Sequence, residues 1–214
     1  VAADIGWKEF FVNPALQQLI QIALDNNRDL RLAALNVERT QALYRIQRAD
    51  RLPSVNGSFG LQRQPSVLTG EQTSNYSIGL GITAFELDFF GRVKDLTRAA
   101  LSSYMATEEA QRTAQIALVA GVANAYLGLQ SLDEQLALTR ATLKTREDSQ
   151  QLTQLQYRNG AASELDAKQA DSLVYTARAT LATLQRQRDV AYDALAVLLG
   201  QQPPAELITA DTHG

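Results

Sequence analysis

The sequence predicts a mainly α-helical protein that carries one β-hairpin, and three observations lead to this fold class. Ala and Leu dominate the apolar residues and Gln the polar ones, a composition that favours long helices with close-packed small residues. Apolar positions recur at alternating spacings of three and four, which is the pattern of a coiled-coil seam. Only residues 55–64 and 76–85 alternate apolar with small or polar residues, which is the period of a half-buried strand.

The first 53 residues are expected to hold two helices. Residues 1–12 read as irregular, and Asn13 followed by Pro14 indicates the start of a short helix with Asn as its N-cap. Asp29 is expected to cap a second helix that ends near Pro53. The predicted packing seam of this second helix consists of Leu32, Leu35, Arg39, Ala42, Ile46 and Ala49.

A very long helix is predicted over residues 92–157, where only Gly121 and Gly128 could interrupt it. These two glycines would allow the close approach of another helix or slight bending. At 1.5 Å per residue the helix measures roughly 100 Å, about as much as the second and last helices laid end to end. The sequence therefore predicts that both shorter helices pack along the long one.

The last helix is expected to follow a turn at Asn159 and Gly160, with Ser163 as N-cap and Asp166 three positions later. It is expected to end at Gly200. Its predicted seam consists of Leu181, Leu184, Arg188, Ala191, Leu195 and Leu198. The arginines in the two seams are expected to lay their stems along the seam and to leave their charges exposed.

The two predicted strands have the properties of membrane strands. Each is about ten residues long, which is enough for a tilted strand to cross a bilayer, and two strands alone cannot close a barrel. One face is apolar and the other is polar or glycine, as expected for lipid outside and water inside. The alternative, a half-buried sheet in a soluble protein, is commoner by pattern alone, but the chain offers no free element to cover it. The expected lipid-facing residues are Val55, Phe59, Leu61, Tyr76, Ile78, Leu80 and Ile82.

Composition and charge exclude several classes of function. A net charge of −3 gives no basic footprint for nucleic acid. Cysteine is absent, the single histidine, His213, lies in a polar tail, and neither a Ser/His/Asp set nor metal-ligand spacing is found. We therefore expect no enzyme activity, no cofactor and no metal site. No run of eighteen apolar residues is present, so no helix is expected to span a bilayer, and any signal peptide is expected to be missing or already removed.

Three segments carry a family resemblance: "VAADIGWKEFF…LQQLIQIALDNNRDLRLAALNVE" at the start, "TAFELDFFGRVKDL" (83–96) and "YRNGAASELDAKQA" (157–170). Together they resemble the outer-membrane efflux proteins of Gram-negative bacteria, and more narrowly the OprM-type outer-membrane factors of tripartite multidrug pumps. The resemblance covers essentially the whole chain. It implies an outer-membrane channel that is a passive exit duct for drugs and other small molecules, coupled through a periplasmic adaptor to an inner-membrane pump.

The resemblance also implies an oligomer. In the family, three protomers with two repeats each build a twelve-stranded barrel that continues as a helical tunnel across the periplasm. This sequence holds one repeat, and the lipidated N-terminal cysteine of many relatives is absent from it. The expected assembly is therefore either a homotrimer of chains of about twice this length or six single repeats.

The implied organisation has four parts. Residues 1–53 are expected to form the N-terminal segment and helices of the equatorial or upper periplasmic region, 54–90 the outer-membrane hairpin, 91–200 the long periplasmic helical hairpin, and 201–214 a polar tail or linker to a second repeat. The adaptor would dock at the tip of the helical hairpin, where small residues allow another hairpin to approach. The tip residues are Arg158, Asn159, Gly160, Ala161, Ala162 and Ser163.

Alternatives remain for these residues and for the whole chain. The tip is equally well read as a plain turn whose small residues suit its geometry. By the resemblance, Asp166 joins polar contacts that constrict the tunnel; the other interpretation is an acidic residue favoured by the helix dipole. For the whole chain, the alternative to a duct is a soluble coiled-coil scaffold whose strands pair with a partner's sheet.

Overall fold

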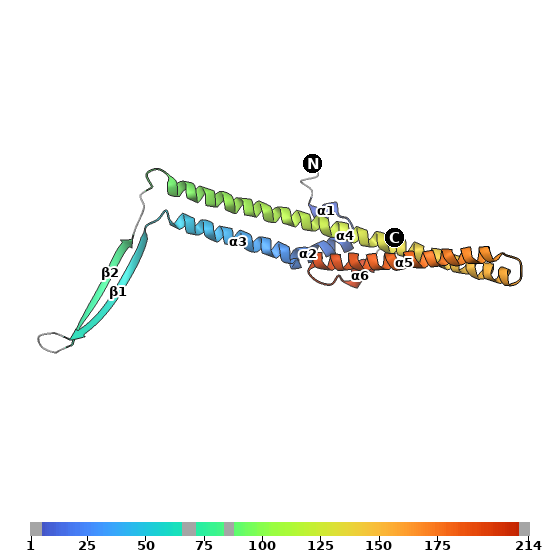
Figure 1. The fold of residues 1–214 in the computed structure, drawn as a ribbon. Coiled ribbons are helices and arrows are strands. Elements are labelled where there is room, and N and C mark those ends of the chain that lie inside the picture. The colour runs from blue at the N-terminus through green and yellow to red at the C-terminus, as the bar shows by residue number, and fades with distance from the viewer. Residues whose placement is uncertain (1–5, 66–71, 84–87, 210–214) are drawn as a thin grey trace. The chain divides into compact units, whose positions relative to one another are not determined.

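The structure, a computed structural model, describes residues 6–65, 72–83 and 88–209 (Figure 1). It confirms a mainly helical fold with a two-stranded antiparallel sheet. By its internal contacts the chain divides into two compact units, residues 1–32 with 112–214 and residues 33–111. In chain order the elements are α1 (Trp7–Phe10), α2 (Pro14–Asn26), α3 (Arg28–Ala49), β1 (Ser54–Pro65), β2 (Gln72–Thr83), α4 (Arg92–Arg158), α5 (Glu164–Leu199) and α6 (Ala205–Thr209).

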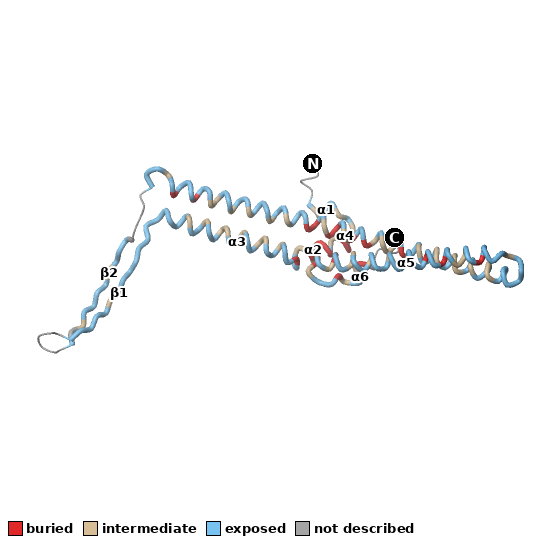
Figure 2. Tube along the Cα trace, viewed as in Figure 1, coloured by how far each residue is buried: buried red, intermediate tan, exposed pale blue. Residues whose placement is uncertain are grey.

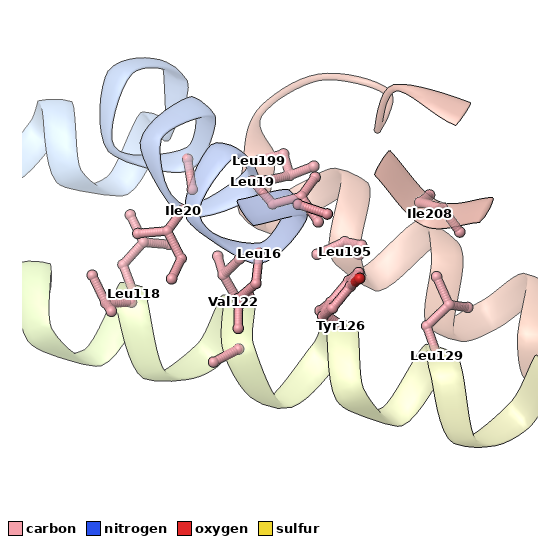
Figure 3. Close-up of a cluster of buried hydrophobic side chains, with 14 residues drawn as sticks. Leu16, Leu19, Ile20, Leu118, Val122, Tyr126, Leu129, Leu195, Leu199 and Ile208 are labelled. Atoms are coloured by element: carbon pink, nitrogen blue, oxygen red, sulfur yellow. The ribbon is translucent and has the colours of Figure 1, made fainter. Parts of the chain in front are cut away.

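The first unit is built around an apolar core in which α2, α5 and α6 meet the middle of α4 (Figure 3). Asn13 caps α2 as predicted, because its Oδ1 accepts hydrogen bonds from the N–H groups of Ala15 and Leu16 at 2.8 and 3.1 Å. Ile208 of α6 is buried in this core, so part of the expected polar tail is packed. The core side chains labelled in Figure 3 are Leu16, Leu19, Ile20, Leu118, Val122, Tyr126, Leu129, Leu195, Leu199 and Ile208.

Asn27 links α2, α3 and α5. Its Oδ1 accepts a hydrogen bond from the N–H of Leu30, and its Nδ2 donates one to the carbonyl of Leu198, both at 2.9 Å. Asn27 is therefore the residue that caps α3, and the expectation that Asp29 does so is wrong. The reason is backbone geometry: Asn27 is extended, as an N-cap must be, whereas Asp29 already lies in the first helical turn.

α4 and α5 form an antiparallel helical hairpin in the same unit. The predicted seam of α5 is confirmed, since all six of its residues are buried or half-buried. Arg188 in this seam does not leave its charge free: its Nε lies 2.8 Å from Asp133 Oδ1, with the two side chains 30% and 25% exposed. The hydrogen bond to Asp133 raises the pKa of Arg188. The expectation of an exposed charge is wrong here because α4 places a carboxylate opposite the guanidinium.

In the second unit α3 lies beside the first part of α4. The rings of Tyr44 and Tyr104 stack with their centroids 6.4 Å apart, and the Thr97 hydroxyl donates a hydrogen bond to the carbonyl of Gln47 at 3.4 Å. All six residues of the predicted α3 seam, Arg39 included, are exposed. That prediction is wrong for this chain, because a tyrosine ring and polar groups, rather than the leucines, face α4.

Three smaller expectations also differ from the structure. The short helix α1 forms where irregular chain was expected. A methyl group on Gly128 would meet nothing within 4 Å, so this glycine marks no close helix approach, whereas one on Gly121 would touch Leu198 at 3.8 Å. By length and composition, α4 contains one stretch apolar enough to cross a bilayer, contrary to expectation. One such helix is weak evidence for a span, because the core helix of a soluble protein meets the same criterion.

Candidate functional site

The two strands are paired so that the apolar residues of one lie opposite those of the other. β1 and β2 are antiparallel and have 12 residues each. All seven residues predicted to contact lipid share one face of this sheet. The apolar cross-strand pairs on that face are Val55 with Ile82, Gly57 with Leu80, Phe59 with Ile78 and Leu61 with Tyr76, and toward the far ends of the strands Arg63 with Ser74 and Pro65 with Gln72 continue the same face.

This apolar face is not covered by any described part of the chain. The exposed fraction of its seven large side chains runs from 58% for Leu61 to 84% for Leu80. Figure 2 shows both strands exposed along almost all of their length. A contiguous apolar patch of this kind marks a surface that contacts a membrane or a partner.

The opposite face of the sheet is small and polar. Gly60 lies opposite Ser77, and Gly79 lies opposite Ser58. Methyl groups on the two glycines would come within 2.6 and 2.8 Å of the facing serine hydroxyl oxygens. In the space beside Gly79, the Ser58 hydroxyl donates a hydrogen bond to the carbonyl of Gly79 at 3.4 Å. Glycine on this face therefore leaves the room that the serine hydroxyls occupy.

The turn between α4 and α5 is closed by a Schellman motif. Gly160 has a φ of 74°, in the left-handed region that glycine adopts without strain. Its N–H donates to the carbonyl of Tyr157 at 3.0 Å, and the N–H of Ala161 donates to the carbonyl of Gln156 at 2.8 Å. These two bonds satisfy the last carbonyls of α4 and fix the direction in which the chain leaves the helix.

The start of α5 is fixed by the predicted capping box. Ser163 Oγ accepts a hydrogen bond from the N–H of Asp166 at 3.1 Å, and Asp166 Oδ2 accepts one from the N–H of Ser163 at 3.0 Å. The Ser163 hydroxyl also donates to Asp166 Oδ2 at 2.6 Å. These bonds from Ser163 hold the pKa of Asp166 below its ordinary value of 3.8. The carboxylate of Asp166 is thus engaged in the helix cap.

The six predicted tip residues come together as one surface at the end of the helical hairpin. Ala162 is half-buried and the other five, Arg158–Ala161 and Ser163, are exposed. Three leucines near the turn, Leu152, Leu155 and Leu165, are also exposed. The tip therefore presents small side chains next to exposed apolar ones.

A polar cluster behind the tip links the two helices and was missed by sequence reasoning. Asp171 Oδ1 accepts hydrogen bonds from the Nε2 atoms of Gln150 and Gln154 at 2.7 and 3.1 Å. The bond from Gln150 is the main cause that lowers the pKa of Asp171. The sequence feature that could have indicated this cluster is the spacing of three and four between Glu147, Gln150 and Gln154, which places these polar residues on one face of α4.

The geometry defines a class of protein. A long helical hairpin with an exposed tip occurs in one chain with a strand pair that is apolar on one face and polar on the other. Among residues 6–65, 72–83 and 88–209, no group of three or more His, Cys, Asp or Glu is placed to hold a metal ion. An isolated strand pair is only marginally stable and leaves both edges open. Further strands beside β1 and β2 would satisfy those open edges.

The chain belongs to the outer membrane efflux protein family, which matches residues 19–201. The probable efflux pump outer membrane protein TtgC of Pseudomonas putida is 50% identical over 212 residues, which are 96% of this chain and 44% of that protein. A crystal structure of a membrane protein from Pseudomonas aeruginosa has a TM-score of 0.83 at 45% identity, with 98% of this chain and 50% of that one covered. The MtrE outer membrane channel of Neisseria gonorrhoeae, in its open state, has a TM-score of 0.75 at 35% identity, with 90% and 43% covered. The chain thus spans half or less of the length of these relatives.

Proposed function

We propose that this chain forms part of an outer-membrane channel, the exit duct of a tripartite efflux system in a Gram-negative bacterium. Residues 54–90 contribute strands to a barrel in the outer membrane, and residues 1–53 and 91–200 contribute helices to a periplasmic tunnel. The duct is a passive conduit for drugs and other small molecules, and an inner-membrane pump supplies the energy. Membership in the efflux family and the likeness to TtgC and to the MtrE channel support this proposal.

One observation carries the proposal: the cross-strand register that collects seven exposed apolar side chains on one face and small or polar residues on the other. In a membrane barrel the first kind of face contacts lipid and the second faces water. Each strand has 12 residues, which exceeds the roughly 9–11 that a tilted strand needs to cross the hydrocarbon core. Because open edges are costly in lipid, the barrel takes strands from other copies, as a trimer of double-length chains or as six single repeats.

The helix tip is the proposed docking site for a periplasmic adaptor. Within residues 158–163, the small residues Gly160–Ser163 allow the close approach of another helical hairpin, and the exposed leucines beside them add apolar area. The Schellman motif and the capping box hold this surface in one conformation, which lowers the entropic cost of binding. A role for Asp166 in a tunnel constriction would require a partner that competes with its bonds from Ser163.

Single introduced cysteines can test whether the apolar face of the sheet contacts lipid, because this sequence contains no cysteine. Ile78→Cys places a thiol on the apolar face, and Ser77→Cys, the matched control, places one on the opposite face one residue away. In outer-membrane vesicles we expect a fluorescent label at position 78 to be quenched by brominated lipids. The thiol at position 77 should instead react with a reagent that is soluble in water and does not enter membranes.

Reaction of both thiols from water, without quenching at position 78, would contradict the duct. Such a result would favour the alternative, a soluble scaffold whose strands pair with a partner's sheet. In that case the protein would also be extracted without detergent.

A further inference from the structure

Three arginines lie close together where α3 leads into β1. Arg45, Arg48 and Arg51 line, together with Ala49 and Leu52, a hollow of about 540 Å³. Arg45 and Arg48 lie in the last turns of α3, and Arg51 follows the helix shortly before β1. Because Arg45 is only about 6 Å of helical rise from the end of α3, the three charges occupy a narrow band next to the sheet.

None of these three guanidinium groups has an ion-pair partner among the described residues. The helix dipole favours a cation in the last turn of α3, which accounts for Arg48 but not for Arg51 beyond the helix. Three like charges so close together are stabilised by a nearby anion. Among the residues that the structure describes, three carboxylates of the same region have other partners: Asp50 with Gln47, Asp88 with the N–H of Lys94, and Asp95 with Arg98.

Apolar side chains flank the same end of the sheet. Leu52 precedes β1, and Phe89 and Phe90 follow β2, whose last residues pair with the first residues of β1. The three side chains are 72%, 81% and 99% exposed. Membrane barrels carry aromatic girdles where the sheet leaves the lipid, and basic residues beside them attract anionic lipids. The arginines and these apolar residues together have the chemistry of a membrane boundary.

We propose that this junction surface, made of Arg45, Arg48, Arg51, Leu52, Phe89 and Phe90, binds the headgroups of anionic phospholipids. The guanidinium groups donate paired hydrogen bonds to the lipid phosphate, and the apolar side chains lie at the boundary of the acyl chains. The lipids belong to the leaflet that faces the helices. The inference rests on the proposed insertion of the strands into a bilayer and adds a lipid-binding site to it.

The test compares two triple variants of equal charge. Arg45→Gln/Arg48→Gln/Arg51→Gln removes the junction charges, and the control Arg28→Gln/Arg31→Gln/Arg39→Gln removes three exposed arginines of the same helix that are farther from the strands in the chain. The protein is placed in nanodiscs of phosphatidylcholine with or without phosphatidylglycerol, and native mass spectrometry counts the retained phosphatidylglycerol. A basic residue near an anionic surface contributes about a fivefold preference for anionic lipid. The preference of the junction variant for phosphatidylglycerol should therefore fall about a hundredfold, whereas the control variant should keep the preference of the unchanged protein.

Several results would overturn the inference. Equal retention of phosphatidylglycerol by both variants would do so, and so would an equal loss in both, since that is a general effect of charge. If inorganic phosphate stabilises the protein in phosphatidylcholine discs as much as phosphatidylglycerol does, the site binds free phosphate rather than lipid. Quenching at position 78 without any preference for phosphatidylglycerol overturns this site alone, whereas the absence of quenching overturns the duct itself.

Discussion

Two glycines with almost the same backbone conformation have different neighbours. Gly200, at the C-terminus of α5, has a φ of 70°, and Gly160, at the tip, has a φ of 74°. A methyl group on Gly200 would collide with the backbone carbonyl of Asn26, whereas one on Gly160 would meet nothing within 4 Å. Gly200 is therefore required both by its conformation and by the close approach of α2, and Gly160 only by its conformation.

We expect Gly200→Ala to lower the free energy of unfolding by about 3 kcal/mol, because the cost of a left-handed alanine adds to that of overpacking against backbone. Gly160→Ala should cost only about 1 kcal/mol, since strain alone acts there. Urea unfolding followed by circular dichroism measures both. Equal losses in the two variants would contradict the close contact between α5 and α2.

The capping box at Ser163 and Asp166 should stabilise the start of α5 less in acid than at neutral pH. Since the bonds from Ser163 lower the pKa of Asp166, the carboxylate stabilises the folded state above its ordinary value of 3.8 and loses this effect as pH falls through the lower folded value. We expect Ser163→Ala to cost about 1 kcal/mol at neutral pH and to weaken the loss of protection in acid. Hydrogen exchange of the first amides of α5, measured from pH 6 downward, checks this prediction.

Glu164→Gln is the control, because Glu164 lies in the same turn and takes no part in the capping box. In the Glu164→Gln variant, the first amides of α5 should lose protection from hydrogen exchange in acid as they do in the unchanged protein. If Ser163→Ala kept the full acid dependence of the wild-type protein, the hydrogen bonds to Asp166 would not be its cause.

At the scale of elements, the polar pairs between α4 and α5 differ in how far they are withdrawn from water. Asp133 and Arg188 have side chains 25% and 30% exposed, whereas Glu147 and Arg178 are 35% and 56% exposed. Screening by water weakens the more exposed pair. Because Arg188 lies in an otherwise apolar seam, its pairing with Asp133 also favours one register of the two helices.

Double-mutant cycles measure this difference. Replacing Asp133 and Arg188 by Asn and Gln, singly and together, should give a coupling energy of about 1.5 kcal/mol. The same cycle with Gln at positions 147 and 178 should give about 0.5 kcal/mol and should fall further in high salt. Equal coupling energies would mean that burial of the Asp133 pair adds nothing to its strength.

At the scale of the whole molecule, the two faces of the sheet should respond oppositely to charge. Ile78→Lys places a cation among exposed apolar side chains, which in a membrane barrel costs about 2–4 kcal/mol near the midplane. Ser77→Lys places the same cation on the polar face, where water would solvate it. We therefore expect Ile78→Lys, and not Ser77→Lys, to reduce the amount of assembled protein in outer membranes.

Native mass spectrometry of detergent-extracted particles is the readout. The mass of the Ser77→Lys particle also distinguishes three double-length chains from six single repeats of 23.4 kDa. Equal assembly of both lysine variants would contradict lipid contact on the apolar face.

The same kind of sequence pattern predicted the structure correctly in some elements and wrongly in others. The seam of α5 was correct, since its leucines and alanines at spacings of three and four are buried or half-buried in the helical hairpin. The same pattern failed on α3, where its stacked Tyr44 faces α4 and the leucines are exposed. The alternation correctly predicted which strand residues share a face, and a slip of one residue would move every apolar side chain to the other face, but the pairs themselves came from the structure.

The sequence by itself determined the longer helices and both strands, the two faces of those strands, the capping box and the family, because each depends on the order of neighbouring residues, whereas it missed the short helices α1 and α6. Only the tertiary structure decided that Asn27 joins α3 to the carbonyl of Leu198, 171 residues away, and that Asp133 meets Arg188. It also decided that Asp171 binds Gln150 and Gln154 across the helical hairpin. These contacts depend on how distant helices are placed side by side, and no local pattern records that placement.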